Sequence, residues 1–142
     1  MAGLIERNLF EDDFVGGLSF FERLVWIGIF AAAADDQGRF MDAPALVRAR
    51  VFLYDPNVTD AMVDKALGKM AKAGRIIRYG ASGRRLCQIV NWWKVQKLSW
   101  AGESKYPAPD GWIDRVKMHV TGGTIKIGSG WNTPRRVYFH AT

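Results

Sequence analysis

Cysteine and histidine are scarce in this chain of 142 residues, and their scarcity excludes several kinds of site. The single cysteine, Cys87, cannot form a disulfide within the chain and has no companion at a metal-ligand spacing. Neither of the two histidines, His119 and His140, lies beside a nucleophile in a known catalytic arrangement. No phosphate-binding glycine motif is present. We therefore expect no enzyme, no metal, no cofactor and no small-molecule substrate.

Hydrophobic runs long enough to cross a membrane are also lacking. The apolar run at residues 24–34 has eleven residues, whereas a membrane-spanning helix needs about 20. The acidic start of the chain, residues 1–13, lacks the basic-then-apolar order of a signal peptide. Together with the lone cysteine, these features predict a cytoplasmic protein with no membrane partner.

Basic residues are concentrated in one part of the chain. The formal net charge is +6, and residues 75–106 alone hold seven basic and one acidic residue, a surplus of the same size. Residues 1–38, in contrast, hold two basic and seven acidic residues. The local excess indicates a surface for a polyanion, although a solvated basic surface without a partner is the alternative.

Residues 57–96 give the clearest structural pattern. Thr59 is a good N-cap, the following apolar residues recur at helical spacing, and Gly74 suits the end of that helix. Residues 75–90 then change to β-branched and aromatic composition, interrupted by small residues at Gly80–Gly83. This pattern predicts a helix that runs directly into a two-stranded hairpin with arginines at its tip.

An earlier helix is predicted where Ser19 and Glu22 form a capping box. One face of this helix is formed by Phe20, Leu24, Ile27 and Ala31. Further apolar residues spread around nearly the whole circumference, namely Val25, Trp26, Ile29 and Phe30. Such a helix must be covered on several sides, so it is either central to the core or partly a dimer contact.

Between these two segments the chain predicts a short strand and a second helix. Residues 39–41 are long enough only for a strand beside the hairpin. Asp42 is the expected cap of a helix with Pro44 in its first turn and with Leu46 and Val47 on its apolar face. The order helix, strand, helix, helix, strand, strand predicts an α+β fold of the winged helix-turn-helix type, with three helices and a β-wing.

Three regions are predicted along the chain. Residues 1–18 form an N-terminal arm that is mobile or depends on a partner. Residues 19–109 form the winged-helix domain with a basic, aromatic tail. Residues 110–142 form a small C-terminal β extension, with a hairpin turning at Gly122-Gly123 and a third strand at residues 136–140. Whether this extension is an independent unit is left open.

A winged helix binds DNA by placing its third helix in the major groove and its wing on the phosphates. The basic residues expected to contact double-stranded DNA are Arg48, Arg50, Lys65, Lys69, Arg75, Arg78, Arg84, Arg85, Lys94 and Lys97. Trp92 and Trp100 lie among lysines, where aromatic rings either stack on unpaired bases or pack onto the domain. Asp60 and Asp64 in the first turns of the third helix favour a protein partner instead, because they would face phosphate repulsion.

Several segments together resemble a known family. They are ADDQGRF at 34–40, VRARVFLYD at 47–55, AGRIIRY at 73–79, QIVNWWKVQK at 88–97 and SKYPAP at 104–109. This combination resembles the winged-helix domain at the N-terminus of phage replisome organisers and related, DnaD-like replication-initiation proteins. The resemblance implies a cytoplasmic phage or prophage setting and binding to double-stranded origin DNA, often as a homodimer or a larger assembly. The second, helical domain of such proteins has no counterpart here, so we do not expect helicase loading by this chain alone.

Two functions are therefore expected. The first is DNA binding in phage replication initiation or its control. The alternative is a protein-interaction adaptor, or a phage-encoded inhibitor, that docks on a replication protein or another host or phage nucleic-acid machine.

Overall fold

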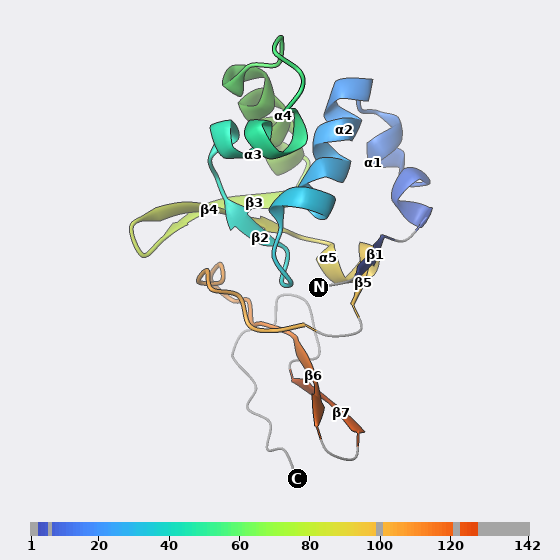
Figure 1. Ribbon diagram of the computed structural model, residues 1–142, viewed down its shortest axis with the longest axis vertical. Helices are drawn as coiled ribbons and strands as arrows, with labels where there is room; N and C mark the ends of the chain where they lie inside the picture. The colour runs from blue at the N-terminus through green and yellow to red at the C-terminus, as the bar shows by residue number, and fades with distance from the viewer. Residues whose placement is uncertain (1–2, 6, 99–100, 121–122, 128–142) are drawn as a thin grey trace.

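The computed structural model describes residues 3–5, 7–98, 101–120 and 123–127, and it has a mixed α+β architecture (Figure 1). The main helices are α2 (Phe20–Gly28), α3 (Pro44–Val51) and α4 (Asp60–Lys72). The main sheet contains β2 (Arg39–Met41), β3 (Ile76–Ala81) and β4 (Arg84–Ile89). Figure 1 shows the three helices on one side of this sheet. The α+β class and the expected order of these elements are confirmed.

Helix α2 begins at the predicted capping box. The Ser19 hydroxyl accepts a hydrogen bond from the Glu22 backbone N–H at 3.2 Å, and the Glu22 carboxylate accepts one from the Ser19 N–H at 2.8 Å. The helix continues into a π-helical segment, η2 (Ile29–Ala33). Its buried side chains are Val25, Trp26, Ile29 and Phe30. The other predicted face points outward, since Phe20 is 85% and Leu24 46% exposed.

Helix α4 has the predicted N-cap, because the Thr59 hydroxyl accepts from the Met62 N–H at 3.2 Å. Its buried face is Val63, Ala66, Leu67 and Met70. Helix α3 differs from the prediction at its start. The N-cap residue is Ala43, without a side-chain cap, and the prediction for Asp42 is wrong because its carboxylate turns to Arg78 instead.

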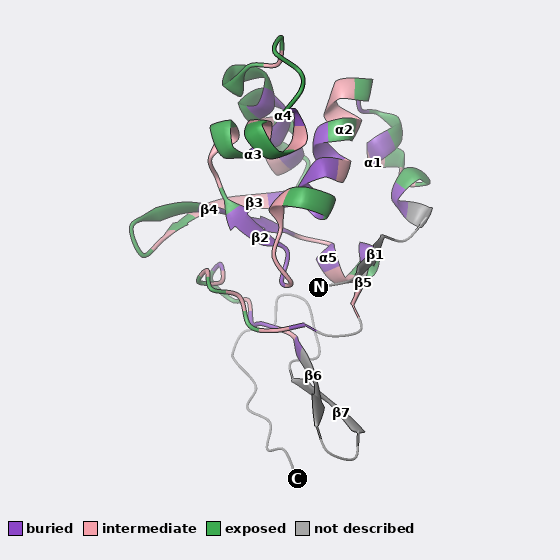
Figure 2. Cartoon of the chain, viewed as in Figure 1, coloured by how far each residue is buried: buried purple, intermediate pink, exposed green. Residues whose placement is uncertain are grey.

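The sheet has the strand order β2-β4-β3, and all neighbours are antiparallel. The predicted hairpin is confirmed but is longer than expected, because Ala81 pairs with Arg84 and only Ser82 and Gly83 form the turn. Both turn residues have positive φ, 53° and 74°, as a tight two-residue hairpin turn requires. Buried residues lie along α2, α4, β2 and β4, where helices and sheet face each other (Figure 2).

The N-terminal residues pack against this unit. Strand β1 (Gly3–Ile5) pairs with β5 (Gln96–Leu98), and η1 (Arg7–Phe10) and α1 (Asp13–Gly16) follow. The side chains of Leu9, Val15 and Leu18 are buried in the same core as α2 and α4. Residues 9–18, which were expected to belong to an arm that is mobile or depends on a partner, bury apolar surface within the chain.

The chain after β5 returns to the sheet. Residues 113, 114 and 116, which lie beyond the boundary predicted at residue 109, are buried, and Asp114 forms an ion pair with Arg39. The predicted hairpin is present as β6 (Val116–Val120) and β7 (Gly123–Ile127). Val120 pairs with Gly123, so Gly123 belongs to β7 and not to the turn predicted at Gly122-Gly123. The predicted strand at 136–140 lies outside the described residues.

The short helix α5 (Trp92–Val95) completes the unit at the end of β4. None of the helices in the described residues combines the length and the apolar character that crossing a membrane requires.

Candidate nucleic-acid interface

Arg78 is the most tightly held of the predicted DNA contacts. Its Nε and Nη2 donate to the two Asp42 oxygens at 2.8 Å each, and Nη2 also donates to Asp64 at 2.5 Å. The hydrogen bonds that the guanidinium donates to Asp42, and then the one to Asp64, raise its pKa. Arg78 thus joins β3 to the start of α3 and to α4, and its charge is neutralised within the protein.

Arg75 is likewise engaged inside the chain. Its Nη1 and Nη2 donate to Asp12 at 2.5 and 3.2 Å, and its guanidinium lies 4.7 Å from the Phe14 ring. This pair ties the N-terminal segment to the start of β3. Arg75 is seven residues before Ser82, so it lies roughly 20 Å from the wing tip at the rise of a β-strand.

Two more predicted cations form ion pairs on the surface. Arg48 on α3 pairs with Asp60 at the start of α4, and Lys69 on α4 pairs with Glu22 on α2 at 2.9 Å. The Ser19 N–H, then Lys69, lower the pKa of Glu22. Arg50 is exposed, and its Nη1 lies 3.5 Å from the carbonyl oxygen of Ala32. Asp60 and Asp64 therefore present much less net charge than the sequence suggested.

The wing tip carries cations that remain available. Arg84 is exposed and makes no ion pair in the described part of the chain. The Arg85 side chain is 67% exposed, and its Nη2 lies 3.9 Å from Asp42, at the limit of an ion pair. Both arginines follow the Ser82–Gly83 turn directly, so the hairpin places two guanidinium groups at its end.

The outward face of α4 adds two lysines. Lys65 and Lys72 are exposed, lie opposite the buried face of the helix and have no partner among the described residues. Gly68 lies between them, and a Cβ there would lie 3.9 Å from Nη1 of Arg78. We did not expect Lys72 as a contact, although its seven-residue spacing from Lys65 is the signal that would have found it.

Lys94 and Lys97 lie away from the wing. Lys94 is exposed on α5 and lines, with Arg75 and Glu11, a cavity of about 370 Å³ beside the N-terminal segment. Lys97 belongs to β5, and its side chain lies outside the described residues. Among the predicted contacts whose side chains are described, Arg75 and Lys94 thus lie apart from the wing arginines.

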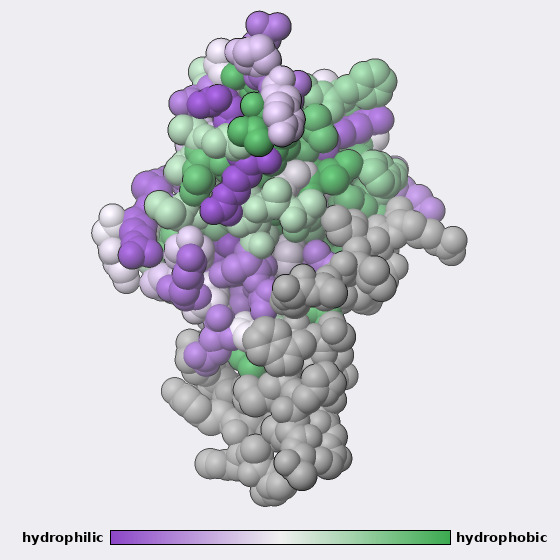
Figure 3. All heavy atoms as spheres, viewed as in Figure 1, coloured by the Kyte–Doolittle hydropathy of each residue, from purple (hydrophilic) through white to green (hydrophobic). Residues whose placement is uncertain are grey.

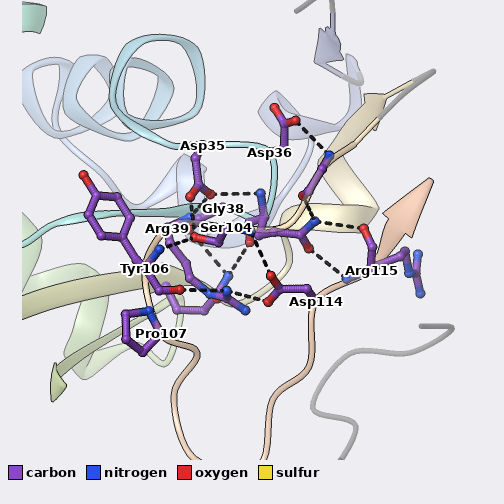
Figure 4. Close-up of polar contacts among 12 residues, drawn as sticks. Asp35, Asp36, Gly38, Arg39, Ser104, Tyr106, Pro107, Asp114 and Arg115 are labelled. Atoms are coloured by element: carbon purple, nitrogen blue, oxygen red, sulfur yellow. Dashed lines mark hydrogen bonds and ion pairs between the residues drawn. The ribbon is translucent and has the colours of Figure 1, made fainter. Parts of the chain in front are cut away.

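The aromatic tail is held by a polar network, shown in Figure 4. Arg39, only 1% exposed, donates from Nε to Gln88 at 2.7 Å and lies 2.6 Å from an Asp114 oxygen. The latter contact is an ion pair without the alignment of a hydrogen bond. Gln37 donates to the carbonyl of Arg115 and accepts from its N–H, both at 2.9 Å. These contacts anchor residues 101–116 beside β2.

Trp92 is packed in the core of the protein, so its ring is not available to stack on a nucleic-acid base. It is 2% exposed, its ring stacks on Phe30, and its Nε1 donates to the Asp36 carbonyl at 2.8 Å. Gly38, with φ of +80°, makes room for this ring, since a Cβ would lie 2.7 Å from Trp92 Cγ. Trp100 lies outside the described residues.

The described residues contain no cluster of three or more side chains suited to a metal ion. Burial raises the pKa of Cys87, which is fully enclosed in β4.

Comparison of the chain with protein-family models, curated proteins and solved structures found no match.

Proposed function

We propose that this protein is a winged-helix protein that binds double-stranded DNA and acts in phage or prophage replication initiation or its control. The order of α2, β2, α3, α4, β3 and β4, with β2 paired to β4, is the arrangement expected for such a fold. The observation that carries the proposal is the pair of exposed arginines, Arg84 and Arg85, at the end of the hairpin.

The proposed contact uses two surfaces with different roles. The outward face of α4, with Lys65 and Lys72, enters the major groove, while Arg84 and Arg85 contact backbone phosphates. Arg48, Arg75 and Arg78 are better assigned to holding the fold, because their charges are matched by carboxylates. The replication role is supported by the sequence resemblance alone.

Salt-dependent binding to labelled duplex DNA tests the proposal. Phosphate contacts release counterions, so the affinity should fall steeply between about 50 and 200 mM salt. The double variant Arg84→Ala/Arg85→Ala should bind more weakly and reduce the slope of log affinity against log salt by about 2. The matched control is Lys105→Ala, which removes an exposed cation from the tail. An unchanged slope in the double variant would contradict the wing contact.

A protein-interaction adaptor or inhibitor is the second candidate. It is favoured by the ion pairs of Arg48, Lys69, Arg75 and Arg78, which engage four of the ten predicted DNA contacts within the protein. Pull-down from infected cells, with and without nuclease, separates the two functions. A partner that is retained after nuclease treatment favours the adaptor, whereas loss of all partners favours DNA.

A further inference from the structure

A narrow pocket lies where α3, β2 and the end of η2 meet the aromatic tail, and the proposed DNA contact does not use it. Its apolar lining is Ala33, Phe40, Met41, Leu46 and Val47. Phe40 and Val47 are buried, whereas Met41 and Leu46 remain 36% and 37% exposed. The volume of about 20 Å³ is far below the roughly 300 to 1,000 Å³ of a small-molecule site. The group that fits is therefore the tip of an apolar side chain that belongs to a larger molecule.

Two cations lie at the rim of this pocket. Arg50 lines it, and its Nη1 donates to the Ala32 carbonyl at 3.5 Å, which leaves most of the guanidinium N–H groups for a partner. Lys105 holds Nζ 5.2 Å from the centre of the Tyr106 ring, which also lines the pocket. Figure 4 shows this ring directed away from the polar network. Arg50 and Lys105 are exposed and form no ion pair within the described part of the chain.

The carboxylates on the neighbouring elements do not neutralise these cations. Asp42 is 4% exposed and accepts hydrogen bonds from Arg78. Asp35 accepts from the Ser104 hydroxyl, and Glu103 also has an interaction within the chain. The pocket thus combines an apolar centre with unmatched positive charge at its edge. The complementary ligand carries an apolar side chain with carboxylates on either side of it.

The exposed side of α3 extends this surface. Ala45 and Ala49 are exposed and lie one helical turn apart, beside Leu46. Figure 3 shows hydrophobic side chains over α3 with hydrophilic ones next to them. Alanine side chains are short, so a peptide can approach the helix closely beside the pocket. Arg48 on the same helix is already paired with Asp60. Arg50 and Lys105 are therefore the cations that a peptide would meet at the pocket.

We propose that this pocket and the exposed side of α3 bind an acidic peptide segment of another protein. One apolar side chain of the peptide enters the pocket, and its carboxylates contact Arg50 and Lys105. A nucleic acid matches this surface less well, because its bases are too large for the pocket and its phosphates are not apolar. The inference does not depend on DNA binding by the wing, so either can fail without the other.

Fluorescence anisotropy tests the proposal with the full chain and a labelled heptapeptide that has leucine at its centre and aspartate at the other positions. Binding should be saturable and should weaken as the salt concentration rises. A peptide with asparagine for aspartate, and another with serine for leucine, should each bind at least about 5-fold more weakly, because each loses one kind of contact. No binding of the first peptide at about 1 mM, or equal binding of the asparagine peptide, would overturn the proposal.

Glutamine substitutions test the residues that form the site. Arg50→Gln and Leu46→Gln should each weaken binding of the aspartate peptide by about 5- to 10-fold. Arg84→Gln is the matched control for charge, and Met62→Gln on α4 is the control for Leu46, since Met62 is 40% exposed. Both controls should leave the affinity unchanged, and urea unfolding should show all four variants folded. Equal losses in a variant and its control would place the peptide elsewhere and refute the site.

Competition with duplex DNA separates the peptide from a nucleic acid as occupant. The double variant Arg84→Ala/Arg85→Ala lacks the proposed wing contact, and it should keep the labelled peptide bound when unlabelled duplex is added in excess. Displacement of the peptide by duplex in this variant would show that a nucleic acid occupies the pocket, and it would overturn the assignment to a peptide.

Discussion

Arg78 donates two hydrogen bonds of 2.8 Å to the two carboxylate oxygens of Asp42, across 36 residues of sequence. The Asp42 side chain is 4% exposed, so this pair is partly removed from solvent. The same guanidinium also holds Asp64, whose side chain is 56% exposed. One arginine thus offers a direct comparison between an enclosed and an exposed partner.

Asp42→Asn should destabilise the fold by about 1.5 to 3 kcal/mol, because it removes the charge from hydrogen bonds in an enclosed site. Asp64→Asn is the matched control and should cost less than about 1 kcal/mol, since its carboxylate is solvated. Urea unfolding of both variants checks the prediction. Equal losses would mean that burial does not determine the strength of these contacts.

Two helical glycines, Gly68 in α4 and Gly28 in α2, should respond to alanine with opposite signs. At Gly68 an added Cβ meets only Arg78 at 3.9 Å, so Gly68→Ala should stabilise by about 0.8 to 1 kcal/mol through helix propensity. At Gly28 the Cβ would lie 2.6 Å from Cγ1 of Val51, so Gly28→Ala should destabilise by about 1 to 3 kcal/mol. Thermal and urea unfolding measure both, and a stabilising Gly28→Ala would contradict the close contact of α2 with α3.

Asp114→Asn should cost about 3 to 5 kcal/mol, because it leaves the Arg39 guanidinium buried without a counter-ion. It should also release residues 101–116 and speed tryptic cleavage at Lys105. Asp110→Asn is the control, since Asp110 is exposed in the same segment, and it should change stability by less than about 0.5 kcal/mol. Unchanged proteolysis of Asp114→Asn would show that the ion pair does not hold the segment.

The hydroxyl of Tyr79 should lose its proton at a higher pH than that of an ordinary tyrosine. Burial raises its pKa to about 12, and its hydroxyl donates to the Pro107 carbonyl at 2.6 Å. An unfolded tyrosine titrates near about 10, so the native state keeps a proton that the unfolded state loses. The stabilisation is complete below pH 10 and should be lost as the pH rises toward 12. Phenolate absorbance follows the titration, and Tyr79→Phe should lack the late step and lose less stability over this range.

Alanine substitutions of Lys65 and Lys69 should reduce DNA affinity by different amounts if α4 contacts phosphates. Lys65→Ala should weaken binding and reduce the salt slope by about 1. Lys69→Ala should have a smaller effect, because Lys69 already pairs with Glu22. Fluorescence anisotropy at several salt concentrations compares them, and equal effects would mean that the pair with Glu22 opens on binding.

Features that depend on near neighbours in the chain were predictable from the sequence. The cap at Thr59, the capping box of Ser19 with Glu22 and the hairpin ending at Ser82–Gly83 each involve residues a few positions apart. Local spacing and turn chemistry specify such features. The periodicity of α2 also identified both of its apolar faces, but it could not show which one the rest of the chain would cover.

The carboxylate partners of the arginines were not predictable from the sequence. Arg75 meets Asp12 across 63 residues, and nothing in the local sequence of either indicates the other. The charge count was correct for residues 75–106, yet charge alone does not reveal which groups are neutralised by a distant partner. The same limit explains the error at Asp42, whose capping role was plausible locally but whose carboxylate is engaged by Arg78.

The position of Asp114 has a consequence for biosynthesis. Arg39 leaves the ribosome 75 residues ahead of its counter-ion, since 114 minus 39 is 75. At about 5 to 20 residues per second, that interval is roughly 4 to 15 s. Since Asp114 is the only carboxylate that pairs with Arg39 among the described residues, we expect the sheet to close around this guanidinium only at a late step of synthesis.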